Sequence, residues 1–294
     1  MTKDLVMQLI FLVVRVVFQM IISFMILFLF FLLSHLHTFS YLCKMISKIN
    51  YRRSAGTEQP LVLLHGFMES QAIWDSFFDA FGEERRVIAI DLPGHGKTEQ
   101  FAEIHTMSLM AECVKMVLDA ENIEKATIIG HSMGGYAALE FANLFPERTE
   151  QFGLFHSQAA AETEQGIENR NRAVEALKQN KKGFISQLIP DLFAPENVVK
   201  FQTEIQNLIE MAQTMSVESI IAALLGMRDR NCRLDTLKNA KNSVIFIQGK
   251  QDKRFPDELV FSQIQLCNQA EVLYLNCGHM GFLECRQETI EFLK

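Results

Sequence analysis

The chain has 294 residues, of which 49% are hydrophobic and 21% are charged, and its formal net charge is −7. This composition is typical of a globular protein with a sizeable core, built as one large domain or two small ones. No cluster of Lys and Arg dominates the sequence after residue 60. We therefore expect no nucleic acid partner, because binding to phosphates requires concentrated positive charge.

The cysteines are scattered, without C-x-x-C pairs and without the spacing of metal ligands. They are Cys43, Cys113, Cys232, Cys267, Cys277 and Cys285. In a chain of this length, scattered cysteines indicate reduced thiols and a reducing compartment. The pattern gives no support for a metal site.

Residues 1–44 form a hydrophobic N-terminal segment that differs from the rest of the chain. Val16 to Leu33 is an apolar run of 18 residues, interrupted only by Gln19 and Ser23. As a helix it would be about 27 Å long, close to the bilayer core of about 30 Å. One interpretation is therefore a transmembrane or signal-anchor helix at residues 16–33. A cleavable signal peptide fits less well, because no small-x-small cleavage site follows.

The charges around this run bear on its orientation. Lys44, Lys48, Arg52 and Arg53 follow it, and Lys3 and Arg15 precede it. By the positive-inside rule, the rest of the chain would be membrane-anchored and face the cytoplasm. The alternative, of nearly equal weight, is that translation begins at Met45, which leaves 250 of the 294 residues as a domain without an anchor.

From residue 60, short apolar runs alternate with longer amphipathic segments. The runs are expected to form strands at Leu61–Leu64, Arg86–Ile90, Ala126–Ile129, Gln151–Phe155, Ser243–Ile247 and Glu271–Leu275. Helices are expected at Ser108–Asp119, Met133–Leu144 and Pro256–Cys267, and a short edge strand at Asn50–Arg53. Because most of the strands are almost continuously apolar, the pattern predicts an α/β fold. Its sheet would be mostly parallel, with helices on both faces and ligands at the carboxyl ends of the strands.

The alternation stops between Ser157 and Ala240, where no strand is predicted. The sequence there is polar and helix-like, with helices expected at Glu162–Lys178, Lys182–Ile189, Pro195–Thr214 and Val217–Met227. We therefore expect residues 157–240 to form a helical cap inserted into a domain that spans residues 45–294.

The strongest motif is GHSMGG at residues 130–135. It directly follows the strand Ala126–Ile129 and opens a helix at Met133, which is the context of the G-x-S-x-G nucleophile elbow. Glycines two positions before and after Ser132 avoid clashes in such a tight turn. Ser132 would project above the sheet as a nucleophile, and the N–H of Met133 would face an oxyanion. The alternative is a glycine-rich turn with a bystander serine.

A serine nucleophile needs a base, and the base needs an orienting carboxylate. Asp252 lies in the loop after the fifth predicted strand, and His279 lies in the loop after the sixth. Both loops lie at the same sheet edge as Ser132, which makes His279 the candidate base and Asp252 the candidate acid. His279 is the only histidine after His156, whereas Asp257 lies close to Asp252 and leaves the acid less secure.

The strand Leu61–Leu64 runs into the sequence HGF at 65–67. Gly66 permits a sharp turn, so that the N–H of Phe67 can face the site as a second oxyanion donor. A plain turn would explain the glycine but not the neighbouring His65, to which we assign a structural role in holding the loop.

The sequence DLPGHG at 91–96 is expected to form a scaffold turn, in which Asp91 accepts hydrogen bonds from backbone N–H groups. Three further histidines are assigned structural roles: His95, His105 and His131. His156 follows a predicted strand end, where it either faces the pocket or packs in the core.

Five motifs in this order carry a resemblance to a known family. They are LVLLHGF at 61–67, DLPGHG at 91–96, GHSMGG at 130–135, GKQD at 249–252 and GHMGFLE at 278–284. The sequence resembles the α/β-hydrolase superfamily, specifically its compact prolyl-aminopeptidase, esterase and haloperoxidase-like branch. The resemblance excludes the N-terminal segment. It implies Ser132 as nucleophile, Asp252 as acid, His279 as base, Phe67 and Met133 as oxyanion donors, and a cap at 157–240.

We therefore expect a hydrolase that cleaves a carboxylic ester or thioester of a small-molecule acyl substrate, without a metal or organic cofactor. The same triad also serves hydrolysis of amides, lactones and carbon–carbon bonds, and cofactor-free perhydrolysis, and the motifs do not separate these reactions. A ligand-binding module is the alternative outside enzymes, although such proteins often lose a triad member. If residues 1–44 are translated, a membrane-tethered hydrolase of lipid-derived esters is a further alternative.

Overall fold

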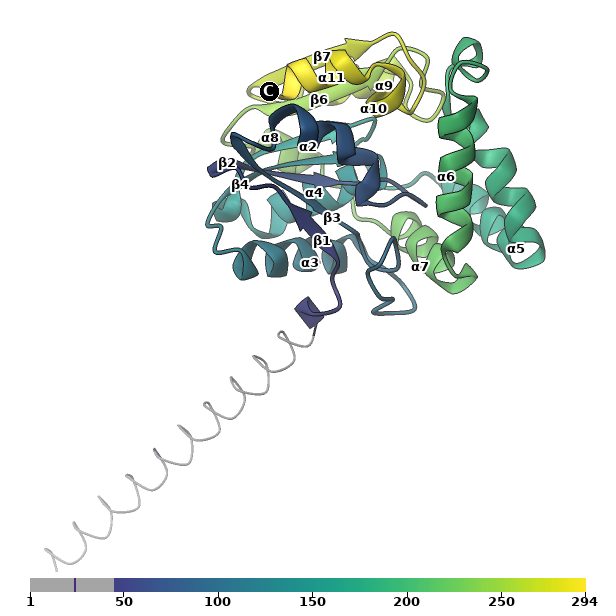
Figure 1. Cartoon of the computed structure of the whole chain (residues 1–294), viewed down its shortest axis with the longest axis horizontal. Helices are drawn as coiled ribbons and strands as arrows, with labels where there is room; N and C mark the ends of the chain where they lie inside the picture. The colour runs from purple at the N-terminus through teal and green to yellow at the C-terminus, as the bar shows by residue number, and fades with distance from the viewer. Residues whose placement is uncertain (1–23, 25–44) are drawn as a thin grey trace, which may run out of the picture. The chain divides into compact units, whose positions relative to one another are not determined.

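In the computed structural model, seven strands form one sheet in the order β1-β3-β2-β4-β5-β6-β7 (Figure 1). They are β1 (Tyr51–Arg53), β2 (Glu58–Leu64), β3 (Arg85–Ile90), β4 (Ala126–His131), β5 (Thr149–Phe155), β6 (Val244–Gly249) and β7 (Ala270–Leu275). The edge strand β1 runs antiparallel to β3, and all other neighbours are parallel. The structure describes residue 24 and residues 45–294, and Lys48–Lys294 form one compact unit.

The strands form where apolar residues can be buried from both faces of the sheet. β4 and β6 are buried over their whole length, which matches their near-continuous apolar sequences. Both strands run two residues beyond their predicted ends, because glycines there still pair with the neighbouring strand: Gly130 lies opposite Leu154, and Gly249 opposite Leu275. β2 begins at the exposed Glu58, before the apolar run that predicted it.

Helices connect the strands and cover the sheet. They are α2 (Asp75–Phe81), α3 (Met107–Ala120), α4 (Met133–Leu144), α5 (Glu164–Leu188), α6 (Gln202–Thr214), α7 (Val217–Arg228), α8 (Leu234–Lys238), α9 (Asp257–Ile264), α10 (Gly281–Glu284) and α11 (Arg286–Leu293). Figure 1 shows α2 and α11 on one side of the sheet and α3 on the other, where it packs against α4. The predicted α/β fold with a mostly parallel sheet is confirmed.

The segment between β5 and β6 is helical, and α5, α6 and α7 lie together beside one end of the sheet (Figure 1). The helices predicted at Glu162–Lys178 and Lys182–Ile189 together make up α5, which is divided between them by a kink at Asn180, whose φ of −154° and ψ of 78° are not helical. The helix expected from Pro195 instead begins at Gln202, after a separate 3₁₀ turn at Pro195–Asn197. α5 packs against both α6 and α7.

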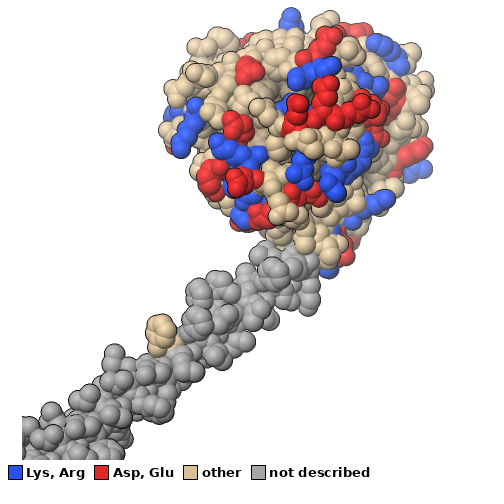
Figure 2. All heavy atoms as spheres, turned by 60° about the vertical axis from the view of Figure 1, so that its left-hand side comes forward, with Lys and Arg blue, Asp and Glu red and all other residues tan. Residues whose placement is uncertain are grey.

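Charged side chains of both signs are interspersed on the face drawn in Figure 2. Within the described residues, no single helix is both long enough and apolar enough to cross a membrane. α6 and α7 pass this test only as a pair, bent by 101°. The helix predicted at residues 16–33 lies outside the described residues except for residue 24.

Candidate active site

Ser132 lies at the turn between β4 and α4, where it is the N-cap residue of the helix. Its φ of +50° is rare for a residue with a side chain and marks a strained turn. The turn needs glycine on both sides. A Cβ on Gly130 would lie 2.0 Å from the carbonyl oxygen of Gly134, and a Cβ on Gly134 would lie 2.5 Å from that of Leu64. The motif therefore folds as the tight strand–helix turn that the sequence predicts.

Two hydrogen bonds from the end of β5 hold the backbone of this turn. The N–H of Ser132 donates to the carbonyl oxygen of Phe155 at 2.8 Å. The hydroxyl of Ser157 donates to the carbonyl oxygen of Ser132, also at 2.8 Å. The position of Ser132 thus depends on the strand next to its own.

Asp252 and His279 form a buried hydrogen-bonded pair. His279 Nδ1 donates to Asp252 Oδ2 at 2.7 Å, while Asp252 Oδ1 accepts from the N–H of Arg254 at 2.8 Å. Burial alone would raise the pKa of Asp252, but the imidazoles of His279 and His156 outweigh burial and hold this pKa well below its ordinary value. Asp252 is therefore ionised, and the bond to Nδ1 leaves Nε2 of His279 free to accept a proton.

Ser132 and His279 lie in the wall of one cavity, with a volume of about 540 Å³. Within the described residues, no hydrogen bond joins the Ser132 hydroxyl to His279; the two side chains meet only as parts of this wall. Phe67 lines the same cavity, and helices α5 and α7 contribute apolar residues to it: Phe184, Leu188, Leu224 and Met227.

Phe67 lies in the same cavity wall as Ser132, and Met133 directly follows Ser132 in the chain. Phe67 follows the end of β2, and Met133 is the first residue of α4. Neither N–H donates a hydrogen bond to another residue of the described part of the chain. Both groups are therefore free donors, as an oxyanion site requires.

Glu69 belongs to the site and was not identified from the sequence. Its Oε2 accepts from the N–H of Gly66 at 2.5 Å and lies 3.0 Å from Nδ1 of His131. Nε2 of His131 donates to the carbonyl oxygen of His279 at 2.9 Å. The pair thus joins the loop of Phe67, the strand of Ser132 and the loop of His279. Its partners are 62 residues apart, so no local pattern could indicate them.

The two nitrogens of His131 both face oxygen acceptors, so both must carry a proton. Burial opposes the charge on His131, but the Glu69 carboxylate outweighs burial and raises the pKa of this imidazole. Burial likewise favours neutral Glu69, but His131 outweighs it and lowers the pKa of Glu69. The pair is a buried ion pair beside Ser132.

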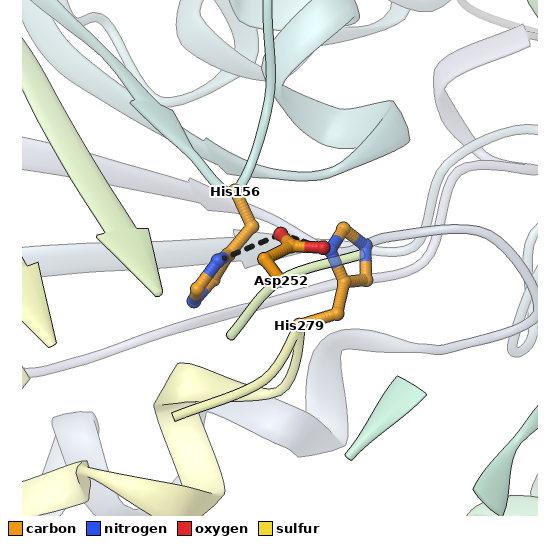
Figure 3. Close-up of side chains that lie close together, drawn as sticks. All are labelled: His156, Asp252 and His279. Atoms are coloured by element: carbon orange, nitrogen blue, oxygen red, sulfur yellow. Dashed lines mark hydrogen bonds and ion pairs between the residues drawn. The ribbon is translucent and has the colours of Figure 1, made fainter. Parts of the chain in front are cut away.

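His156 lies on the other side of Asp252 from His279 (Figure 3). Its Nδ1 is 3.1 Å from Asp252 Oδ2, and its side chain is fully buried and does not line the cavity. His156, Asp252 and His279 offer ligand atoms within 4.8 Å of one another, a spacing that would also suit a metal ion. Imidazole–carboxylate hydrogen bonds account for this spacing without a metal.

His65 and Asp91, in the neighbouring loops, accept hydrogen bonds from backbone N–H groups. His65 Nε2 accepts from the N–H of Leu92 at 2.9 Å. Asp91 accepts from the N–H of Gln71 at 2.7 Å and from the N–H of Lys97 at 2.9 Å. Both side chains therefore stabilise the loops around the site.

A family model described as the alpha/beta hydrolase fold matches residues 59–151. Two curated relatives match most of the chain. One is the dihydrolipoyllysine-residue acetyltransferase component of the acetoin cleaving system of Pseudomonas putida, 30% identical over 80% of this chain and 63% of that protein. The other is a 2-hydroxy-6-oxononadienedioate/2-hydroxy-6-oxononatrienedioate hydrolase of Paraburkholderia phymatum, 28% identical over 79% of this chain and 84% of that protein. The chain spans less than two thirds of the length of the acetyltransferase component.

Solved structures share the whole fold. An esterase from Thermogutta terrifontis superposes with a TM-score of 0.79 at 25% identity, over 83% of this chain and 91% of that one. An enol-lactonase from Burkholderia xenovorans superposes with a TM-score of 0.77 at 18% identity, over 83% of this chain and 94% of that one, and supports the fold alone. With its sheet order and its strand–Ser132–helix turn, the chain belongs to the α/β-hydrolase superfamily of enzymes.

Proposed function

We propose that the protein is a serine hydrolase that cleaves a carboxylic ester or thioester of a small-molecule acyl substrate. In this proposal Ser132 is the nucleophile, His279 the general base and Asp252 the acid that orients His279. The observation that carries the proposal is the 2.7 Å hydrogen bond between His279 and Asp252, with His279 and Ser132 in the wall of the same cavity.

The chemistry follows from the tautomer of His279. Nε2 takes the proton of the Ser132 hydroxyl as its oxygen attacks the acyl carbon. The N–H groups of Phe67 and Met133 stabilise the oxyanion that forms, and loss of one such donor typically costs about 3 kcal/mol. The protonated His279 then gives its proton to the leaving alcohol or thiol, which leaves an acyl-enzyme. Water, deprotonated by His279, releases the acid and restores Ser132.

The helices of residues 157–240 form, in this proposal, the cap that selects the substrate. Their apolar side chains suit an acyl chain, but the cavity wall also carries Arg170 and Arg230, which share Glu162 at 2.6 and 2.8 Å. Two guanidiniums and one carboxylate leave an excess positive charge. This favours substrates with a carboxylate of their own, and the relative from Paraburkholderia phymatum is named for a dioate.

The test is Ser132→Ala, assayed with a panel of p-nitrophenyl esters. We expect the wild-type protein to turn over at least one ester, and the variant to lose at least about 10³-fold in kcat. Undiminished turnover in the variant would refute the proposal. A fluorophosphonate probe should label the wild-type protein and Ser262→Ala, a control at an exposed serine, but not Ser132→Ala. A wild-type protein that stays unlabelled would favour the ligand-binding alternative.

A further inference from the structure

We infer that His156 is a positioning residue of the active site, a second imidazole that donates to the catalytic aspartate and fixes it from the side opposite His279. The inference rests on the proposed function, in which Asp252 orients the base. Asp252 Oδ2 is 2.7 Å from Nδ1 of His279 and 3.1 Å from Nδ1 of His156 (Figure 3). One carboxylate oxygen thus lies between two ring nitrogens.

The place of His156 in the fold connects it to the nucleophile as well. It is the first residue after β5, between Phe155 and Ser157, the two residues that hold the backbone of Ser132. Three consecutive residues therefore contact both the nucleophile turn and the acid. His156 has a φ of +48°, a strained conformation that persists in proteins only where the surroundings enforce it.

The ring of His156 is held in one orientation by its neighbours. It stacks on Phe155, with ring centroids 5.0 Å apart and an angle of 27° between the ring planes. A Cβ on Gly281 would lie 2.5 Å from Nε2 of His156, and a Cβ on Gly249 would lie 2.7 Å from its Cε1. With glycine required on both sides, the fold encloses this ring closely and directs Nδ1 toward Asp252.

The protonation state of His156 decides whether it donates. Its Nδ1, when it carries no proton, accepts a hydrogen bond from the N–H of Gly249 at 3.2 Å, and it lies 3.1 Å from Oδ2 of the ionised Asp252. Its Nε2 is buried without a partner among the described residues. Burial lowers the pKa of His156 to about 4. The ring is therefore neutral near pH 7 and carries one proton, either on Nδ1 or on Nε2.

The two neutral tautomers of His156 make different contacts at Nε2, with Asp252 and with Gly249. With the proton on Nε2, that N–H is buried without an acceptor, and the lone pair of Nδ1 faces the negative Asp252. With the proton on Nδ1, the N–H of Gly249 loses its acceptor, but a charge-assisted hydrogen bond to Asp252 replaces a repulsion. Each tautomer leaves one donor without an acceptor, so these costs cancel. The hydrogen bond to the Asp252 carboxylate then favours the tautomer with the proton on Nδ1.

The consequence for catalysis is a carboxylate that cannot turn away from His279. His156 and His279 hold Oδ2, and the N–H of Arg254 holds Oδ1. Loss of the His156 donor would remove one of the two imidazoles that hold Oδ2 of Asp252, and His279 would be oriented less well. Hydrogen bonds that orient metal ligands are typically worth about 10- to 100-fold, and we expect an effect of similar size here. It should fall on kcat rather than on KM, because His156 does not line the cavity.

The first test uses the unmodified protein and ¹⁵N-labelled histidine. The ¹⁵N shifts of the two ring nitrogens identify the tautomer. His156 is expected to carry its proton on Nδ1 at pH 7, with a downfield proton signal separate from that of His279. Assignment comes from the loss of this signal in His156→Asn. A proton on Nε2 in the wild-type protein would overturn the inference, whether or not the protein hydrolyses esters.

The second test is a matched pair of variants. His156→Asn keeps an amide N–H near the position of Nδ1 and tolerates a positive φ, whereas His156→Leu has the same branching without a donor. We expect kcat to fall about 10- to 100-fold in His156→Leu with KM within about twofold, and His156→Asn to recover most of the loss. Equal losses in both variants, or no loss in either, would contradict the inference. Thermal melts show whether either variant has lost its fold, and Ser132→Ala shows separately whether the proposed function holds.

Discussion

Nε2 of His131 donates a hydrogen bond to the carbonyl oxygen of His279 at 2.9 Å. The residue before the proposed nucleophile therefore holds the backbone of the proposed base. Since Nδ1 of the same ring faces Glu69, and Glu69 in turn accepts from Gly66, a single buried ion pair sets the distance between three loops of the site. In the proposed mechanism, the geometry of catalysis depends on this pair as well as on Ser132, His279 and Asp252.

Glu69→Gln tests the ion pair. The change keeps the shape of the side chain but leaves a buried imidazolium without its counter-charge, which typically costs about 3 to 5 kcal/mol. We expect the free energy of unfolding in urea at pH 7 to fall by this amount, and kcat to fall with it. The double variant Glu69→Gln/His131→Asn should recover part of the stability, because no buried charge remains. A loss below about 1 kcal/mol in the single variant would show that Glu69 and His131 are not an ion pair.

The buried neutral histidines predict a stability that depends on pH. Burial lowers the pKa of His105 and His156 to about 4 and also lowers the pKa of His65 and His95. Between pH 6.5 and 4 the unfolded chain binds protons at His105 and His156 and the native protein does not, and His65 and His95 contribute in the same direction. The free energy of unfolding should therefore fall as the pH falls through this window, by up to about 1.4 kcal/mol per unit and histidine. His131, with its raised pKa, acts above this window, because its stabilisation is fully present below pH 6.5 and is lost as the pH rises through its native pKa. Urea unfolding at pH 7, 6 and 5 measures the slope.

His105→Phe is the matched variant for this slope. Neither nitrogen of His105 has a hydrogen-bond partner among the described residues, so the change removes a titrating group without breaking a bond. We expect a shallower dependence on pH: between pH 7 and pH 5 the variant should lose less of its free energy of unfolding than the wild-type protein does. An unchanged slope would show that His105 does not contribute.

The nucleophile turn could be predicted because its determinants are local. A buried strand, two glycines and a helix start follow one another at residues 126–135, and each imposes its conformation on its neighbours. The approach of Asp252 to His279 was likewise anticipated, since β6 and β7 are consecutive parallel strands whose ends share one edge of the sheet. The remaining contacts of the site depend on which strands become neighbours.

The contacts of Glu69 and His156 in the site could not be predicted from the sequence. His156 contacts Asp252 because β5 lies between β4 and β6 in the sheet, an order that no local pattern of residues states. By contrast, the break predicted between Lys178 and Lys182 is present as the kink of α5 at Asn180. Long-range packing, and not local propensity, decides the contacts of Glu69 and His156.

Asp252→Asn tests the role of the acid. The amide can donate to Nδ1 of His279, which favours the tautomer with the proton on Nε2 and removes the base. A comparable exchange in another serine hydrolase lowers kcat about 10⁴-fold, and we expect a loss of this order in ester hydrolysis. Asp257→Asn is the control, because Asp257 is the other candidate from the sequence but begins α9 and forms no hydrogen bond with His279 in the described structure. Equal losses in the two variants would contradict the assignment of Asp252.

The charge of the cavity wall predicts a preference among substrates. Burial favours neutral Glu162, but Arg230 and Arg170 outweigh it and lower its pKa, so these three side chains of the wall together keep one net positive charge. We expect the mono-p-nitrophenyl ester of succinate to have a higher kcat/KM than p-nitrophenyl butyrate, because the acyl chains match in length and only succinate carries a carboxylate. Arg170→Gln should lower this preference about tenfold, the value of one charge-assisted hydrogen bond. Lys178→Gln removes a cation from the same helix, where it pairs with Glu175, and should leave the preference unchanged. A wild-type protein that favours butyrate would show that the arginines only brace the cap, because an excess charge that faced the substrate would attract the succinate carboxylate.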